Sequence, residues 1–306
     1  MSQAFIAFAA AHGVEIKRLD DSGKIRRCGT TEHPHSQNGA YVFDGRGGWC
    51  WAWDGAGRAI AYNDPDANPL TEAEKARQEA KRQAFRDEQA HMHRHAAQWA
   101  AKLLAMTRPM EHGYLQLKGL KTVQAPVLPD GELFIPMRDV RSNELLGAQI
   151  VQWLPEERRW EKKYLYGMRS KGAVLRLGPP RAAETILCEG YATALSIEAA
   201  VRQMKLNAAV LVCFSDHNMK VAAERTTGRR YVIADHDAPQ RDPIKARLNP
   251  GEQGQRAAVA TGLGWAMADT EGFDANDLHK ASGLMAVCAL VMKARAAMPA
   301  DVAVPS

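Results

Sequence analysis

Carboxylate side chains directly follow two short apolar runs in the second half of the chain. The run 185–188 stops at Glu189, and the run 231–234 stops at Asp235, with Asp237 two residues further along. Short apolar runs that end at turn residues are typical of strands buried on both faces, as in a parallel sheet. The carboxyl ends of parallel strands lie at one edge of the sheet, so these three acids are predicted to converge there. Gathered carboxylates repel one another unless a cation lies among them, and such oxygen ligands suit a hard divalent ion.

The stretch that joins the two runs alternates between helix and strand. A helical pattern covers residues 192–204, an apolar run covers 208–214, and a polar stretch with a helical pattern follows. Alternation at this spacing predicts βαβ units, whose crossovers are right-handed. The C-terminal half is therefore predicted to be an α/β domain with a parallel sheet.

This ordered set of motifs resembles the Toprim domain, which topoisomerases, bacterial-type primases and some nucleases share. The motifs, in chain order, are Glu189-Gly190-Tyr191-Ala192-Thr193-Ala194, Asp235-His236-Asp237 and Gly254-Gln255-Arg256-Ala257-Ala258. The later run Phe273-Asp274-Ala275-Asn276-Asp277-Leu278 is similar to the closing motif in Toprim primases of phages and mobile elements. A single Glu-Gly pair or Asp-x-Asp is unspecific, whereas the whole set in this order is specific.

The resemblance implies a catalytic site that uses Mg²⁺ or Mn²⁺. Glu189 would act either as a metal ligand or as a general base, and these two roles stay open. Asp235, Asp237 and Asp277 would bind the metal directly or through water, with Asp274 as a weaker candidate. Replicative primases carry a further acid four residues after the glutamate, where this chain has Thr193. Metal binding is therefore expected to depend more heavily on the two acids of the closing motif.

The segment 108–182 predicts a mixed α/β lobe with a basic surface. Apolar strands at 132–139 and 146–153, joined by a polar turn, indicate an antiparallel hairpin. The basic stretch that follows interleaves its charges with tyrosine and glycine, which favours phosphate contact, although a charge run is also typical of a solvated face. Its candidate residues are Arg158, Arg159, Lys163, Arg169 and Lys171. The segment also resembles the N-terminal lobe of the primase catalytic core.

Residues 69–107 predict one long helix that connects this lobe to an N-terminal module. Thr71 and Glu74 have the spacing of a capping box, in which each side chain bonds the other's backbone amide. The larger apolar residues lie in the later half of the helix. The helix is therefore expected to be a solvated connector that docks at its C-terminal end.

Residues 1–68 predict a small β-rich module. Trp49, Trp51 and Trp53 alternate at the period of a strand, so they are predicted to share one face. We favour a hydrophobic face packed on the rest of the molecule, and the alternative is a platform on which bases stack.

The same module is expected to lack zinc. Many primases carry a zinc ribbon at this place, and potential ligands occur at Cys28, His33, His35 and Cys50, but no C-x-x-C pair is present. The run resembles the zinc-free N-terminal module of mobile-element primases instead.

The composition sets looser bounds on the whole chain of 306 residues. A net charge of +5 is compatible with nucleic acid as a partner, and an odd number of cysteines, five, favours a reducing compartment. No apolar run reaches the length of a membrane span, so a cytoplasmic location without membrane contact is expected. The predicted domains are 1–68, 69–107, 108–182 and a Toprim domain at 183–298, with a disordered tail at 299–306.

The function predicted from these patterns is that of a DNA primase. Its partners would be a single-stranded DNA template, ribonucleoside triphosphates and a separate helicase, because the chain has no P-loop motif of its own. Two alternatives stay open: a Toprim nuclease, and a Toprim protein that has lost catalysis and only binds DNA. A topoisomerase fits less well, because the chain is short for the strand-passage domains.

Overall fold

The computed structural model describes residues 2–52, 58–64, 71–238 and 252–297, and these fall into two compact units. One unit runs up to Lys81, and the other contains the described residues from Arg82 onward. Trp53 and the predicted tail at 299–306 lie outside the described residues. No helix in the described part of the chain is long and apolar enough to cross a membrane.

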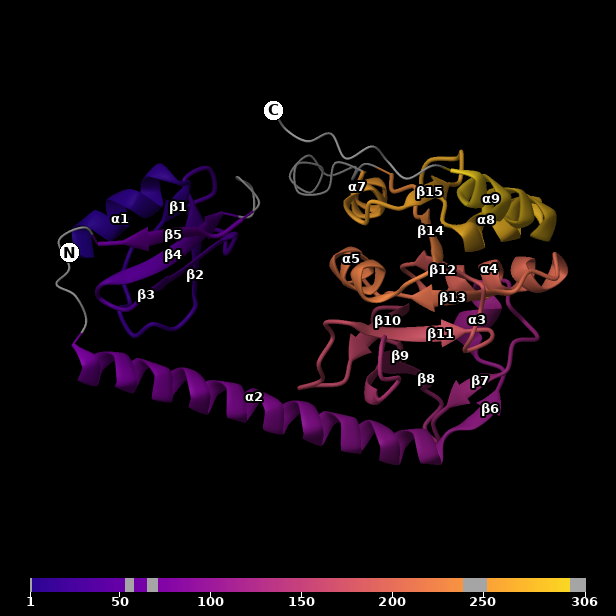
Figure 1. The fold of residues 1–306 in the computed structure, drawn as a ribbon, viewed down its shortest axis with the longest axis horizontal. Coiled ribbons are helices and arrows are strands. Elements are labelled where there is room, and N and C mark those ends of the chain that lie inside the picture. The colour runs from indigo at the N-terminus through magenta and orange to yellow at the C-terminus, as the bar shows by residue number, and fades with distance from the viewer. Residues whose placement is uncertain (1, 53–57, 65–70, 239–251, 298–306) are drawn as a thin grey trace. The chain divides into compact units, whose positions relative to one another are not determined.

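The first unit is a five-stranded antiparallel sheet with one helix packed on it (Figure 1). Its elements are α1 (Ser2–Ala11), β1 (Val14–Glu15), β2 (Arg26–Thr30), β3 (Gly39–Phe43), β4 (Gly47–Ala52) and β5 (Ile60–Asn63). Phe5 of α1 is fully buried and stacks on Phe43 with ring centroids 4.5 Å apart. The β-rich module expected from the sequence is thus present, and its core is aromatic.

The tryptophans of β4 lie on the face of the sheet opposite this core. Cys50 and Ala52 are the residues of β4 that enter the core, so Trp49 and Trp51 point the other way and are half-buried. The alternation was predicted correctly for these two residues, whereas the aromatic core of the module is built from phenylalanine and tyrosine. Burial also raises the pKa of the Cys28 and Cys50 thiols to about 11. This disfavours the thiolate form that zinc requires, and the absence of zinc stays a prediction.

A single helix, α2 (Glu72–Met106), begins in the first unit and ends in the second. The predicted capping box is confirmed: Thr71 N donates to Glu74 Oε2 at 2.9 Å, and Glu74 N donates to Thr71 Oγ1 at 3.3 Å. The two buried residues of the helix, Ala96 and Ala100, lie in its later half, and Ala100 packs against Phe134 and Ile150. The helix is thus largely solvated and packs near its C-terminal end through small side chains, whereas the larger Phe85, Met92 and Trp99 are exposed.

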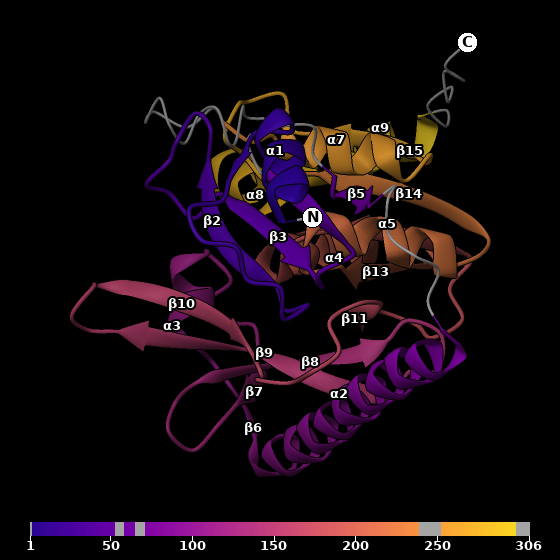
Figure 2. The same cartoon turned by 90° about the vertical axis from the view of Figure 1, so that its left-hand side faces the viewer.

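The second unit contains a ten-stranded mixed sheet. Its first part consists of β6 (Arg108–Met110), α3 (Gly113–Leu117), β7 (Ala125–Val127), β8 (Leu133–Asp139), β9 (Leu145–Leu154), β10 (Arg159–Tyr164) and β11 (Ala173–Leu177). The predicted hairpin is β8–β9, and β10 extends it as a further antiparallel strand (Figure 2). β11 then pairs antiparallel with both β8 and β13, so one continuous sheet joins this lobe to the C-terminal half.

The C-terminal half has the predicted parallel sheet, with strand order β13-β12-β14-β15. Its elements are β12 (Glu184–Cys188), α4 (Tyr191–Gln203), β13 (Ala208–Val212), α5 (Asp216–Arg225), β14 (Arg229–Ala234), α7 (Gln253–Ala260), β15 (Gly264–Met267), α8 (Ala275–Ser282) and α9 (Leu284–Ala296). Helices cover both faces: α4, α8 and α9 one, and α5 and α7 the other (Figure 1). The fold class predicted from the sequence is confirmed.

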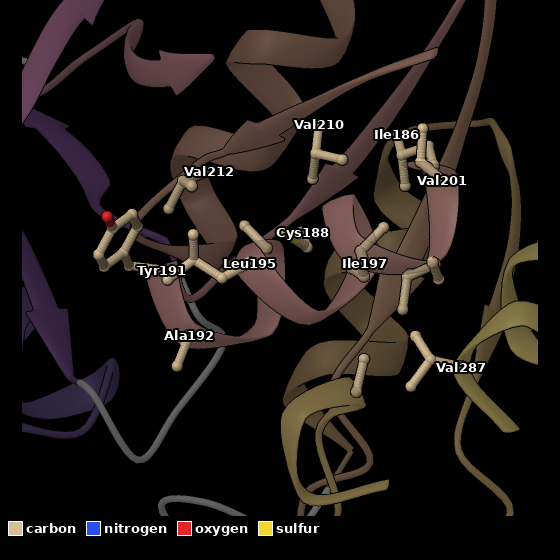
Figure 3. Close-up of a cluster of buried hydrophobic side chains, with 14 of the residues drawn as sticks. Ile186, Cys188, Tyr191, Ala192, Leu195, Ile197, Val201, Val210, Val212 and Val287 are labelled. Carbon is tan, nitrogen blue, oxygen red and sulfur yellow. The ribbon is translucent and has the colours of Figure 1, made fainter. Parts of the chain in front are cut away.

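Side chains of the parallel strands alternate between these two helical layers. Ile186 and Cys188 of β12 pack with Leu195 and Ile197 of α4 (Figure 3), whereas Leu187 packs on the opposite face. Burial on both faces explains why the sequence shows these strands as continuous apolar runs.

One buried amide fastens the lobe to the parallel sheet. Asn218 of α5 accepts from Gly172 N at 2.6 Å and donates to Ala173 O at 2.7 Å and to Cys213 O at 2.8 Å. Its side chain therefore pairs the start of β11 with the loop that follows β13. Each of these backbone groups would lose its partner if the amide were removed.

Replacing this amide should destabilise the second unit. Asn218→Ala leaves three backbone groups without their bonds, and a free energy of unfolding lower by about 2–4 kcal/mol is expected. Denaturant unfolding of the full chain measures this change. Asn207→Ala, at an exposed position, is the matched control. An equal, small effect of both substitutions would contradict the fastening role.

Candidate active site

The predicted acids all lie at the carboxyl edge of the parallel strands. Glu189 follows β12, and Asp235 and Asp237 follow β14. Asp274 is the N-cap of α8, after β15, and Asp277 lies in the first turn of that helix. The structure therefore brings the five predicted metal ligands to one edge, as parallel topology requires.

Asp216 is a sixth acid at this edge, and it was not among the predicted residues. It is the first residue of α5, directly after the N-cap Ser215, and its carboxyl group shares a hydrogen bond with that of Glu189. The signal was present in the sequence, because Asp216 follows the apolar run 208–214 just as Glu189 and Asp235 follow theirs. Its place at the start of a polar helical pattern is equally typical of a residue that only begins a helix.

Burial and mutual repulsion raise the pKa values of these carboxyl groups. The pKa of Glu189 is raised to about 8, first by burial and then by the charges of Asp216 and Asp235. The pKa of Asp235 is raised to about 7 by burial and by the charges of Asp274 and its other acidic neighbours. Burial also raises the pKa of Asp216. The cluster therefore holds protons near neutral pH that ordinary carboxylates would have lost.

The loop after β14 is held in place by backbone contacts. Gly254 N, at the start of α7, donates to Asp237 Oδ2 at 2.9 Å. A Cβ on Gly254 would lie 2.3 Å from the carbonyl oxygen of Asp235, so only glycine allows the helix to approach this closely. His236 anchors the same loop: its ring Nδ1 lies 2.8 Å from Ala268 O, and its backbone N–H donates to Phe273 O.

Asp274 and Asp277 stabilise the start of α8. They form a capping box, with Asp277 N donating to Asp274 Oδ1 at 2.8 Å and Asp274 N donating to Asp277 Oδ2 at 3.4 Å. The ammonium group of Lys118 lies 3.9 Å from an oxygen of each. These two acids therefore present fewer free oxygens than Asp235 and Asp216.

The donor chemistry at the edge fits a hard divalent cation. Asp235 Oδ1 and Asp216 Oδ1 are buried and lack hydrogen-bond partners among the described residues, which is costly unless another ligand satisfies them. All candidate ligands are carboxylate oxygens, the type that Mg²⁺ prefers. In the described part of the chain, no three His, Cys, Asp or Glu residues lie close enough to hold one ion, so the acids would have to draw together.

Thr193 stands at the position where the resemblance implies an acid. It is buried in the first turn of α4, and its hydroxyl packs 3.2 Å from the place that a Cβ of Gly190 would occupy. Its tight packing explains why a small side chain suits this position.

The predicted phosphate-binding residues lie on β10 and in the loop before β11. Lys163 pairs with Glu161 at 2.7 Å, and Arg159 pairs with Glu157 at 2.5 Å. Arg169 pairs with Asp139 at 2.6 Å, so it also supports the turn after β8. Arg158 and Lys171 are exposed and form no ion pair with the described residues.

The end of β10 lies next to the acids. Tyr164, the last residue of this basic strand, donates its hydroxyl to Phe214 O at 2.9 Å. Burial and the charge of Glu189 raise the pKa of Tyr164. The strand that carries Arg159 and Lys163 thus leads to the carboxylate edge.

Comparison with known proteins finds one family match, within the C-terminal half. Residues 184–284, about a third of the chain, match the family model of the Toprim domain. No curated protein matches the chain. Among solved structures, the chain is similar to the RNA polymerase domain of Mycobacterium tuberculosis primase DnaG, at 16% identity and a TM-score of 0.34. The alignment covers 65% of this chain and 62% of that one, which is less than two thirds of its length.

The raised pKa values predict how stability depends on pH. Glu189 and Asp235 hold protons when folded that they release at ordinary carboxyl pKa values when unfolded, so the folded state binds more protons between about pH 4 and 8. In chelator, the melting temperature should therefore fall as the pH rises from 5 to 8. Added Mg²⁺ should raise it more at pH 8 than at pH 5, because its ligands must be deprotonated.

Asp235→Asn isolates the contribution of the cluster. Asparagine keeps the shape but removes one repelling charge, so in chelator at pH 8 the variant should melt at or above the wild-type temperature, with a smaller Mg²⁺ response. Asp87→Asn, an exposed position on α2, is the control. A wild-type melting temperature that stays level or rises between pH 5 and 8 would refute the protonated cluster.

Proposed function

We propose that the chain is a DNA primase, which synthesises short RNA primers on single-stranded DNA by metal-dependent nucleotidyl transfer. The observation that carries this proposal is the junction at Tyr164, where a basic strand meets the carboxylate edge of a Toprim domain. Phosphates held along the strand would lie next to groups able to hold divalent metal. A replicon of the phage or plasmid type, a separate helicase and a cytoplasmic location belong to the same proposal.

The acids divide into two groups by their surroundings. Asp235, Asp237 and Asp216 are the residues that would hold Mg²⁺ or Mn²⁺, since they follow strand ends and two of them carry unpaired oxygens. When bound, such an ion activates the attacking 3′-hydroxyl and neutralises charge on the leaving pyrophosphate. Asp277 and Asp274 would support the cluster from the capping box at the start of α8.

Glu189 is suited to proton transfer as well as to metal binding. In its deprotonated form, a carboxyl group with a pKa of about 8 is a stronger base than an ordinary glutamate, and the fraction in that form grows as the pH rises toward 8. Its neighbour Asp216 would hold it in place through their shared hydrogen bond. Both roles for Glu189, general base and metal ligand, are compatible with this position.

The basic residues would bind the phosphates of template and nucleotides. Arg158, Arg159 and Lys163 are exposed on or beside β10, Lys171 is exposed in the loop before β11, and Arg169 is half-buried and pairs with Asp139. Arg and Lys side chains neutralise phosphates without reading sequence. Start-site preference would then come from other contacts.

One assay separates this function from its two rivals. The protein is incubated with single-stranded DNA, ribonucleoside triphosphates and Mg²⁺ or Mn²⁺. New short RNA supports the primase, shortened DNA supports a Toprim nuclease, and binding without either product supports a replication protein that lacks catalysis.

Asp235→Asn should abolish primer synthesis. The substitution removes a charge that a hard cation needs, whereas the fold and most DNA affinity should remain. Activity is measured over a range of Mg²⁺ and Mn²⁺, with Thr193→Ala as the comparison, since this threonine offers no ligating carboxylate. Near-normal synthesis by Asp235→Asn at low metal would exclude the catalytic assignment.

Neutralising the basic segment should weaken binding in a salt-dependent manner. For the triple substitution of Lys163, Arg169 and Lys171 by alanine, the slope of log K against log salt on single-stranded DNA should fall by about 0.7 for each lost contact. A control variant with Lys102, Arg202 and Lys205 replaced by alanine removes the same charge from exposed positions elsewhere. Equal slopes for both variants would make the segment an ordinary solvated face.

A further inference from the structure

A cavity of about 630 Å³ lies beside β11 and the end of α5, and none of the six acids of the carboxylate edge lines it. Its lining includes Thr185, near the start of β12, and Thr227, just before β14. Three arginines enter it from separate segments: Arg141 after β8, Arg176 on β11 and Arg225 at the end of α5. A smaller cavity of about 200 Å³ shares Arg141 and Arg176. We call this region the arginine groove.

None of the three guanidinium groups has a hydrogen bond or ion pair with another residue in the described part of the chain. This is notable for Arg176, which is half-buried and whose pKa burial lowers. Glu224 is the one acid that lines the larger cavity, and it is exposed. Asp139, beside the smaller one, already pairs with Arg169. The groove therefore keeps an excess of positive charge, and burying such charge is costly unless an anion accompanies it.

The fold makes room for these side chains. Gly172 has a φ of +79°, and a Cβ there would lie 2.2 Å from Nη1 of Arg225, so the arginine lies directly over the glycine backbone. The nearby carbonyls at the end of α5, Ala223 O and Thr226 O, accept from Arg230 instead. The guanidinium of Arg225 therefore lies at the groove and does not bond the last carbonyl groups of its own helix.

The chemistry of the lining indicates phosphate as the ligand. Arginine presents a planar fork of donors that matches phosphate oxygens, and three such forks suit several phosphates in a row better than one small anion. The lining contains no aromatic side chain on which a base could stack. A ligand held here would be recognised by its backbone and not by its bases.

We propose that the arginine groove binds the sugar–phosphate backbone of a nucleic-acid strand, at a second site that shares no lining residue with the carboxylate edge. The site needs no metal and does not depend on primer synthesis. It would hold a strand that runs beyond the acids, and so extend the length of nucleic acid that one molecule contacts.

The test is binding of fluorescent single-stranded DNA to the full chain in chelator, over a range of salt. Replacing Arg141, Arg176 and Arg225 by alanine should lower the slope of log K against log salt by about 2, from roughly 0.7 for each of three contacts. Each single substitution should lower it by about a third of that. The control is again the Lys102, Arg202 and Lys205 variant, which loses the same charge. Melting curves of all variants check that the fold is retained.

The outcomes distinguish the groove from the active site. A lower slope with the groove variant and not with the control supports the proposal, whether or not primers form. Slopes equal to that of the control would overturn it. Loss of fluorescent ATP binding by the groove variant, with unchanged DNA binding, would also overturn it, since the groove would then serve a free nucleotide. Asp235→Asn should leave this metal-free binding intact, so failure of the proposed primase activity and failure of the groove give different results.

Discussion

Repulsion among carboxylates at one sheet edge is the constraint on which the rest of this structure depends. Parallel pairing of β12, β13, β14 and β15 brings their carboxyl ends together, and the chain places an acid after each. The free energy lost there must come from the layers that bury Leu187, Ile186 and their neighbours on both faces of the sheet. Carboxylate repulsion at the edge thus destabilises the fold, and apolar burial in the core offsets this cost. Such local destabilisation is common at functional sites.

The sequence was sufficient for the elements whose burial produces a periodic pattern. The apolar runs predicted the parallel strands, and the spacing of Thr71 and Glu74 predicted the capping box at the start of α2. The positions of Glu189, Asp235 and Asp237 followed from topology alone, because every parallel strand ends at the same edge. Strands, helix caps and strand-end residues are each determined by a short segment, so a single sequence is enough to predict them.

Contacts between distant segments could not be predicted in the same way. Nothing local indicates that Asn218 bonds Gly172, or that Arg141, Arg176 and Arg225 meet at one cavity. The face of the sheet on which Trp49 and Trp51 lie could not be predicted for a related reason. Alternation shows that the two residues share a face, but not which face the core covers. Asp216 was missed because one residue can begin a helix and belong to a site at once.

The continuous sheet has a consequence for what counts as a domain in this chain. The Toprim match ends at residue 284, yet α9 beyond it buries Val287 and Val291 against the same core. At the other boundary, β11 covers the edge of β13. A fragment cut to residues 184–284 would expose the apolar surface that α9 covers and the unpaired edge of β13. Unpaired strand edges of this kind are where chains aggregate. The segment that matches the family and the unit that folds are therefore different lengths of the same polypeptide.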